Sequence, residues 1–173
     1  MAEIDDAPQA QRLYTETFTD LPVFSFAGMI VKARVVDVHD GDTITIVFFF
    51  RGLPIKYHLR MLGYDSPEMR PTLATSDRDL HKAAAECAKR HLESMILNKV
   101  VLVGFCKEEK FGRLMGNVYL DSHHPFTPTG SLGESECANA AMISRGYGKR
   151  YDGKKKKEGF SKIELESIIA KLQ

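Results

Sequence analysis

The sequence predicts an α+β fold that is mainly β, a five-stranded Greek-key barrel with three helices. Three runs rich in β-branched residues follow one another between residues 29 and 62, and turn-forming residues separate them. A long segment with helical periodicity comes next, followed by two further apolar runs and two shorter helical segments. This order suits a small barrel that one helix closes, with the other helices packed outside it.

The first three predicted strands are consecutive in the chain. Residues 29–39 alternate loosely between apolar and polar side chains, as a half-buried strand does. Asp40-Gly41 is a strong hairpin turn signal, so residues 43–50 are predicted to be the second strand. A turn at Arg51-Gly52 leads to the third strand over residues 54–62, whose first position tolerates a proline.

Residues 76–97 are predicted to form the first helix because apolar side chains recur on one stripe at helical spacing. The stripe consists of Leu80, Ala84, Cys87, His91 and Met95. Ser76 and Asp79 are placed to cap the start of this helix.

The second half of the chain supplies the remaining elements. Residues 99–105 and 114–121 are predicted strands. Residues 123–133 contain two prolines and two glycines and are therefore predicted to form a loop. Residues 134–145 are predicted to be a second helix, which a glycine ends. Ser161-x-x-Glu164 has the pattern of a capping box and is expected to open the third helix.

Composition narrows the class of protein. The chain has 173 residues, of which 43% are hydrophobic and 27% charged, which is typical of one soluble domain. The acidic first 22 residues do not resemble a secretory signal, and no apolar stretch is long enough to span a bilayer. The three cysteines are widely spaced and favour free thiols in a reducing compartment, so we expect an intracellular protein.

Charge is unevenly distributed along the chain. The formal net charge is +1, but residues 1–30 carry −4 and residues 149–173 carry +4. A basic end favours a polyanionic partner, although the lysine run at residues 154–157 is also typical of a solvated loop.

Three short motifs carry the side chains with the clearest chemical meaning. They are Asp40-Gly41-Asp42-Thr43, Arg60-x4-Asp65-Ser66-Pro67-Glu68 and Lys110-Phe111-Gly112-Arg113. Hydrolysis of a phosphodiester needs a hard cation, an oriented water and positive charge on the phosphate oxygens. Carboxylates suit the cation and the water, and arginine forks suit the phosphate because they donate two parallel hydrogen bonds.

The order and spacing of these motifs resemble the staphylococcal nuclease family over about residues 31–151. A lone Asp-Gly-Asp is a common turn, but Arg-x4-Asp-Ser-Pro-Glu followed some 45 residues later by Gly-Arg is much more specific. The resemblance implies an OB-fold barrel. It divides the chain into an N-terminal extension over residues 1–28 and a nuclease-like domain over residues 29–173.

The resemblance also implies a role for each motif residue. Asp42, Asp65 and the backbone carbonyl of Ser66 would bind Ca²⁺. Glu68 would orient or deprotonate the attacking water. Arg60 and Arg113 would hold the phosphate and stabilise the transition state. With three carboxylates converging, we expect like-charge repulsion to strain the metal-free protein.

The activity that the resemblance implies is a calcium-dependent nuclease acting on DNA and RNA. Cleavage of the 5′ P–O bond would leave 3′-phosphate ends, and single strands would be preferred because their bases can stack on Tyr147 or Tyr151. We expect a monomer without a membrane partner. The alternative is an OB-fold module that binds nucleic acid without catalysis.

Overall fold

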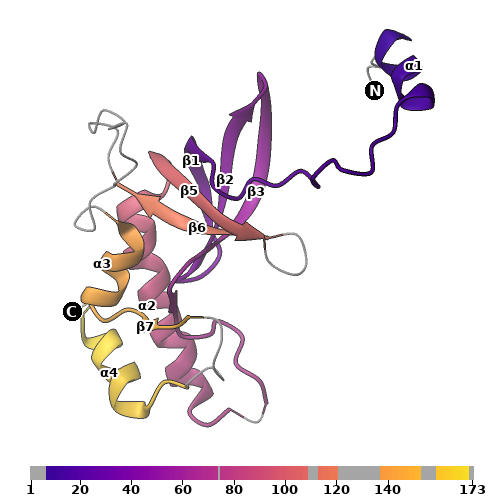
Figure 1. Cartoon of the computed structure of the whole chain (residues 1–173). Coiled ribbons are helices and arrows are strands. Elements are labelled where there is room, and N and C mark those ends of the chain that lie inside the picture. The colour runs from indigo at the N-terminus through magenta and orange to yellow at the C-terminus, as the bar shows by residue number, and fades with distance from the viewer. Residues whose placement is uncertain (1–6, 74, 109–112, 121–136, 153–158, 172–173) are drawn as a thin grey trace.

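A closed five-stranded barrel forms the centre of the computed structural model, which describes residues 7–73, 75–108, 113–120, 137–152 and 159–171 (Figure 1). The barrel strands are β1 (Ile30–Val38), β2 (Thr43–Phe50), β3 (Leu53–Met61), β5 (Val100–Glu108) and β6 (Leu114–Tyr119). Their order around the barrel is β1-β2-β3-β6-β5, with β3 and β6 parallel and the other neighbours antiparallel. The predicted α+β barrel is confirmed.

The two turns of the β1-β2-β3 meander have different physical causes. Arg51 and Gly52 both have positive φ, 49° and 81°, as the tight hairpin between paired residues Phe50 and Leu53 requires. At the other turn, a Cβ added to Gly41 would lie 2.7 Å from the Cβ of Ser66. The glycine therefore lets the chain after β1 approach the segment that contains Ser66.

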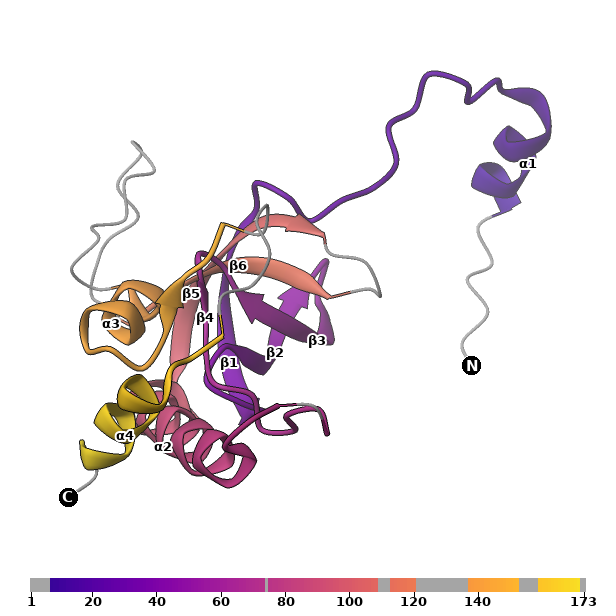
Figure 2. The same ribbon diagram turned by 90° about the horizontal axis from the view of Figure 1, so that it is seen from below.

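The described residues form four helices beside the barrel, one more than the three predicted for the domain. They are α1 (Ala7–Thr15), α2 (Arg78–Ile96), α3 (Ala138–Ser144) and α4 (Lys162–Ala170). The additional helix, α1, lies in the N-terminal segment and stands away from the barrel in Figures 1 and 2. α4 packs beside α2.

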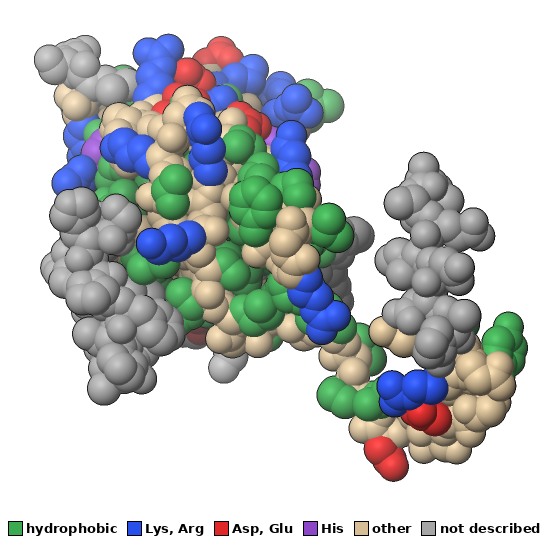
Figure 3. Space-filling view, turned by 90° about the horizontal axis from the view of Figure 1, so that it is seen from above, with side chains coloured by type: hydrophobic (Ala, Val, Ile, Leu, Met, Phe, Trp, Pro, Cys, Tyr) green, Lys and Arg blue, Asp and Glu red, His purple; other side chains and the backbone are tan. Residues whose placement is uncertain are grey.

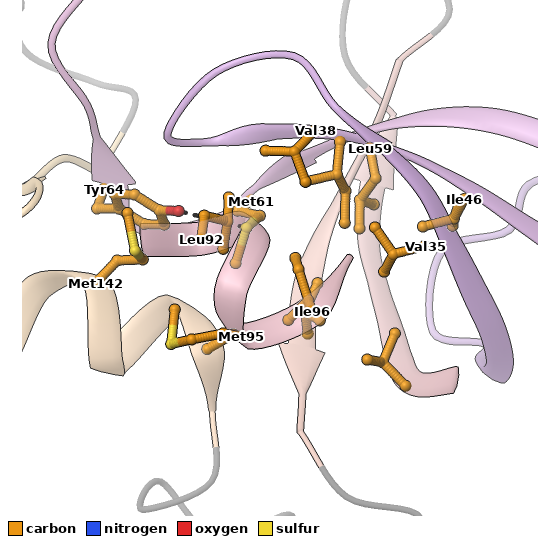
Figure 4. Close-up of a cluster of buried hydrophobic side chains, with 14 of the residues drawn as sticks. Val35, Val38, Ile46, Leu59, Met61, Tyr64, Leu92, Met95, Ile96 and Met142 are labelled. Atoms are coloured by element: carbon orange, nitrogen blue, oxygen red, sulfur yellow. Dashed lines mark hydrogen bonds between the residues drawn. The ribbon is translucent and has the colours of Figure 1, made fainter. Parts of the chain in front are cut away.

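The long helix α2 closes one end of the barrel. Its Leu92 and Ile96 are fully buried and belong to the same hydrophobic cluster as Val35 and Leu59 of the barrel strands. Figure 4 shows these side chains gathered between helix and strands. Of the predicted apolar stripe, Ala84, Cys87 and Met95 are buried, whereas Leu80 and His91 are half-buried. His91 stacks on Tyr147 and not on the barrel, so the prediction is confirmed only for the three buried members.

The start of α2 corrects the predicted cap. The N-cap residue is Asp77, which adopts a left-handed conformation with φ 53° and makes no side-chain capping hydrogen bond. Ser76 and Asp79 therefore do not cap this helix. At α4, by contrast, the capping box is confirmed, because the Glu164 N–H donates to Ser161 Oγ and the Ser161 N–H donates to the Glu164 carboxylate.

A two-stranded sheet that the sequence did not predict lies beside the barrel. It pairs β4 (Tyr64–Asp65) with β7 (Lys149–Arg150), joining Tyr64 to Arg150 and Asp65 to Lys149. Two-residue strands are too short to show a periodicity, so the sequence carries no pattern that predicts them. This sheet matters because it fixes the backbone at Asp65.

The segment between α1 and β1 is anchored to the barrel by an aromatic side chain. Phe26 is buried, and its ring packs edge-on against Phe48 at 5.6 Å and near Phe105 at 5.8 Å. The proposed division between residues 1–28 and residues 29–173 thus falls just after a core residue, and it stays a prediction. The predicted loop over residues 123–133 lies outside the described residues.

The surface carries both basic and hydrophobic side chains. Figure 3 shows them interspersed over the barrel face that is seen from above in Figure 1. Phe49 and Leu53, at the tip of the β2-β3 hairpin, are both highly exposed. None of the described helices is long and apolar enough to cross a membrane. The three cysteines are free thiols, as predicted.

Glu164 links the end of the chain to the β4-β7 sheet. Its carboxylate accepts a hydrogen bond from the Ser161 N–H at 2.7 Å and lies 2.8 Å from Lys149 Nζ. Burial acts to raise the pKa of Glu164, but the hydrogen bonds from Lys149 and Ser161 outweigh it and lower the pKa to about 2. A carboxylate whose pKa is lowered on folding stabilises the fold at any pH above its pKa in the unfolded chain. This stabilisation is lost as the pH falls to the pKa of the folded state.

We expect Glu164→Gln to lower the free energy of unfolding by ~0.5–1 kcal/mol at neutral pH, because an exposed ion pair and part of a cap are lost. The deficit should shrink as the pH falls from about 4.5 towards 2. Urea melts across this range measure it. Glu166→Gln is the matched control, since its carboxylate lies 3.9 Å from Lys162 and outside the capping box. If the loss of stability in Glu164→Gln stays the same down to pH 2, the ionised Glu164 carboxylate is not the stabilising group.

Candidate active site

Asp42 lies at the mouth of the barrel, directly before β2, and is almost fully buried. Its Oδ1 accepts hydrogen bonds from Thr43 Oγ1 at 2.9 Å and from Arg60 Nη1 at 2.9 Å. Its Oδ2 accepts one from the Ser66 backbone N–H at 3.0 Å. One carboxylate therefore joins the start of β2, the end of β3 and the segment after β4.

Arg60 bridges two carboxylates. It lies on β3 opposite Thr43 of β2, with 15% of its side chain exposed. One terminal nitrogen pairs with Asp42 and the other with Asp65. Both aspartate side chains are only 4% exposed, so the two ion pairs are largely screened from water. A buried charge that has no oppositely charged partner lowers the stability of the fold.

The backbone around Asp65 is held from several directions. The Tyr64 hydroxyl donates to the carbonyl oxygen of Gly41 at 2.6 Å and so ties β4 to the turn before Asp42. On β4's other side, a Cβ added to Gly148 would collide with the Tyr64 ring and lie 3.1 Å from the Asp65 carbonyl oxygen. Gly148 therefore allows β7 to approach β4. Neither Tyr64 nor Gly148 had a sequence signal that pointed to this role.

The site carries excess negative charge. Burial, together with the neighbouring charge of Asp42, raises the pKa of Asp40 to about 6. Asp40 also orders the turn, because its Oδ1 accepts a hydrogen bond from the Asp42 N–H at 3.0 Å. Burial and the charges of Asp42 and Asp40 raise the pKa of Tyr64 well above its usual value, so its hydroxyl stays a donor. Such a site favours a cation.

The expected strain of the metal-free protein needs correction. We expected Asp42, Asp65 and Glu68 to converge and repel one another. Instead, Arg60 lies between Asp42 and Asp65 and pairs with both, whereas Glu68 is exposed. Asp42 also accepts hydrogen bonds from Thr43 and Ser66, so it supports the local fold as well as the charge balance.

The donor set fits a hard cation. Asp42 and Asp65 offer buried carboxylate oxygens, and Ser66, 4% exposed, offers a backbone carbonyl. Oxygen ligands suit Ca²⁺, which takes six to eight of them. Within the described residues, no group of three or more His, Cys, Asp or Glu side chains is arranged to hold a metal ion. The set is thus sparse, and a cation shared by both aspartates would require Arg60 to move.

Glu68 and Arg113 lie on two different segments near this cluster. Glu68 is exposed, follows the buried Pro67, and lines a pocket together with Ser66. Arg113 is half-buried and directly precedes β6, which pairs with β3 so that Met115 lies opposite Arg60. The Phe111-Gly112 part of its motif lies outside the described residues.

The two tyrosines considered for base stacking differ in their surroundings. Tyr147 is buried, and its ring stacks on His91 with centroids 4.1 Å apart. Lys171 Nζ lies 5.0 Å from the centroid of the same ring. Tyr147 therefore offers no open face to a base. Tyr151 is half-buried, and its backbone N–H donates to the Gly63 carbonyl oxygen, so it stays a candidate.

Comparisons with known proteins agree with the barrel fold. Residues 58–171 match the family described as staphylococcal nuclease homologue. This match covers about two thirds of the chain, and the chain belongs to that nuclease family. It includes Arg60, Asp65, Glu68 and Arg113, whereas Asp42 precedes it.

Individual relatives are distant. The chain is 26% identical over 149 residues to protein ParB of Escherichia coli, covering 85% of this chain and 73% of that protein. It is 27% identical over 106 residues to an uncharacterized endonuclease of Escherichia coli O157:H7, covering 59% of this chain and 60% of that protein. The chain therefore spans about three fifths of the endonuclease relative.

We expect Asp42→Asn to destabilise the protein in chelator by ~1–3 kcal/mol, because an amide cannot accept all three hydrogen bonds and leaves Arg60 with one fewer carboxylate. Urea melts with chelator present measure the change. Asp37→Asn is the matched control, since Asp37 lies on β1 with its side chain 55% exposed. Equal or greater stability of Asp42→Asn would contradict a structural role for this carboxylate.

Proposed function

We propose that this chain is a calcium-dependent nuclease that hydrolyses phosphodiester bonds of both DNA and RNA. The observation that carries the proposal is the buried pairing of Arg60 with Asp42 and Asp65, next to the segment that bears Glu68. A buried set of oxygens beside a guanidinium suits a hard cation and a phosphate at one site. Membership in a nuclease family supports the same reaction class.

In the proposed mechanism, Asp42, Asp65 and the Ser66 carbonyl would hold Ca²⁺. The bound ion would supply Lewis-acid polarisation of a phosphate oxygen. Arg60 would exchange its carboxylate partners for phosphate oxygens, to which it can donate two parallel hydrogen bonds. The same side chain thus balances charge in the absence of substrate and binds phosphate in its presence.

Glu68 is proposed to act on the attacking water. Its exposed position gives it access to solvent, and Pro67 restricts the backbone just before it. Glu68 accepts the water's proton as the water oxygen bonds to phosphorus and the bond to the 5′ oxygen breaks. The leaving oxygen takes a proton from solvent, and the other product ends in a 3′-phosphate.

Arg113 is proposed to bind the same phosphate as Arg60, from the start of a second β-strand. It directly precedes β6, the strand that pairs in parallel with β3, which carries Arg60. Two guanidiniums from neighbouring strands would stabilise the negative charge that builds on the equatorial oxygens. Tyr151 is the proposed stacking partner for an unpaired base, which would favour single strands. We further propose that the protein acts as a monomer.

The competing function is a module that binds nucleic acid without cutting it. Asp42, Arg60, Asp65, Glu68 and Arg113 all have the residue type that catalysis requires, which favours the nuclease. Both functions predict binding, so cleavage is the observation that separates them.

The purified protein should degrade fluorescent single-stranded DNA and RNA in calcium and stop when chelator is added, because the ligands are hard oxygens. Single strands should be cut faster than duplexes. Gel analysis of products, with end-group mapping, measures both the rate and the 3′-phosphate. Undiminished cleavage in excess chelator would refute the metal assignment, and binding without cleavage would favour the alternative.

Glu68→Gln and Arg113→Ala should each reduce turnover about 10²- to 10³-fold while the fold persists, since each removes a group that acts in the transition state. Arg113→Lys should restore little, because lysine lacks the planar fork. Glu86→Gln and Arg90→Ala are matched controls, an exposed ion pair with its donor and acceptor 2.9 Å apart on the outer face of α2. Near wild-type turnover in the Glu68 and Arg113 variants would place the chemistry elsewhere.

A further inference from the structure

A pocket of about 550 Å³ lies next to the candidate site, outside the cluster of Asp42, Arg60 and Asp65. It begins at Ser66 and Glu68 and continues along the loop that leads to α2. Its other walls are the first turn of α2 and the segment just before α4. The volume falls in the range of small-molecule sites. The side chains that define it are Arg70, Thr72, Thr75, Ser76, His81 and Phe160.

His81 is the feature of this pocket that a purely structural role leaves unexplained. Its residue is only 8% exposed, yet Nδ1 of the ring is buried without a hydrogen-bond partner. A buried polar atom normally has a hydrogen-bond partner, and His81 Nδ1 lacks one. The imidazole lines the pocket, and a rotation of the ring that turned Nδ1 towards the pocket would let a ligand supply that bond.

Glu68 brings one carboxylate to the pocket, and the remaining polar groups favour an anionic, hydroxyl-bearing ligand. Arg70 is exposed and offers a guanidinium fork, which suits phosphate. The hydroxyls of Thr72 and Thr75 lie 3.0 Å apart, and Ser76 adds a third hydroxyl. α2 begins here at Arg78 without a side-chain cap, so the positive end of its dipole lies at the same wall.

The wall opposite α2 is aromatic and is held in place. Lys149 Nζ donates to the Gly159 carbonyl oxygen at 3.0 Å and lies 5.1 Å from the centroid of the Phe160 ring. The backbone of Lys149 pairs with Asp65 in the β4-β7 sheet. The half-buried Phe160 ring is therefore fixed relative to the candidate site and can offer an apolar surface to a base.

We propose that this pocket is a subsite for the nucleotide next to the scissile phosphate. Arg70, the hydroxyls and His81 bind its phosphate and sugar, and Phe160 contacts its base. Because Ser66 and Glu68 line the same pocket, a strand whose phosphate lies at Arg60 continues directly into it. The assignment of this nucleotide as a neighbour of the cleaved bond rests on the proposed nuclease function, whereas nucleotide binding in the pocket does not.

The binding test uses the full chain in chelator, so that no cleavage occurs. Adenosine 5′-monophosphate is titrated while the ring signals of the histidines are followed by NMR, with His81→Gln to assign the His81 signal. We expect saturable shifts of His81 and none of His91, which hydrogen-bonds to Arg145 and stacks on Tyr147. Arg70→Ala should raise the dissociation constant about tenfold, because a charge-assisted hydrogen bond is lost. Arg90→Ala should change it less than twofold.

A second measurement uses binding of a labelled ten-nucleotide thymidine strand at several salt concentrations, again in chelator. Arg70→Ala should reduce the steepness of the salt dependence by roughly 0.7, as expected for one lost phosphate contact on a single strand, and Arg90→Ala should not.

The outcomes separate this proposal from the nuclease proposal. If His81 shifts and Arg70→Ala weakens binding while calcium supports no cleavage, the pocket binds nucleotides and the catalytic assignment fails. If calcium supports cleavage while His81 does not shift or Arg70→Ala behaves like Arg90→Ala, the subsite is overturned. Exposed Arg70 can be replaced without disturbing the core, so misfolding does not obscure the result.

Discussion

Two aspartates that are almost fully buried share one guanidinium, that of Arg60, at the mouth of the barrel. Removing the guanidinium would leave two carboxylates uncompensated away from water, and breaking a buried pair in this way typically costs ~3–5 kcal/mol. The pairing therefore constrains the ends of β2 and β3 and the short strand β4 to one arrangement. It also places the guanidinium that we propose to bind phosphate where a cation would bind.

The surrounding residues hold the side chains of Asp42, Arg60 and Asp65 in position. Gly41 lets the turn before Asp42 approach Ser66, and the Tyr64 hydroxyl bonds to the carbonyl oxygen of that same glycine. Gly148 allows β7 to pair with β4 beside Asp65. Through Lys149, the same small sheet reaches Glu164 and the segment before α4. Stability of the C-terminal helix and geometry of the site are thus physically connected.

The sequence predicted the features that depend on local patterns. Alternation and turn residues placed the second strand at residues 43–50, where β2 lies, and Ser161 and Glu164 marked a capping box that forms. The motif residues were selected because their types match one chemistry. The structure brings Asp42, Arg60 and Asp65 together, and their catalytic roles stay predictions. Which partner Arg60 selects depends on contacts 18 and 5 residues away, which local patterns do not encode.

Other features depend on tertiary packing and were missed or misread. The N-cap of α2 is Asp77 in a left-handed conformation, although the sequence pattern favoured Ser76 as the capping residue. Tyr147 follows the end of α3 and turns inward onto His91, although a tyrosine there is equally compatible with the surface. The strands β4 and β7 are two residues each and form only because the rest of the fold brings them together.

The most direct test of the shared role of Arg60 is a calorimetric titration of calcium into the wild-type protein and Arg60→Met, each verified as folded and without nucleotide. If the guanidinium and the cation compete for Asp42 and Asp65, the variant should bind calcium several-fold more tightly, because close carboxylates left without a guanidinium attract a cation more strongly. Weaker or unchanged binding in the variant, or no calcium binding in either protein, would contradict the account.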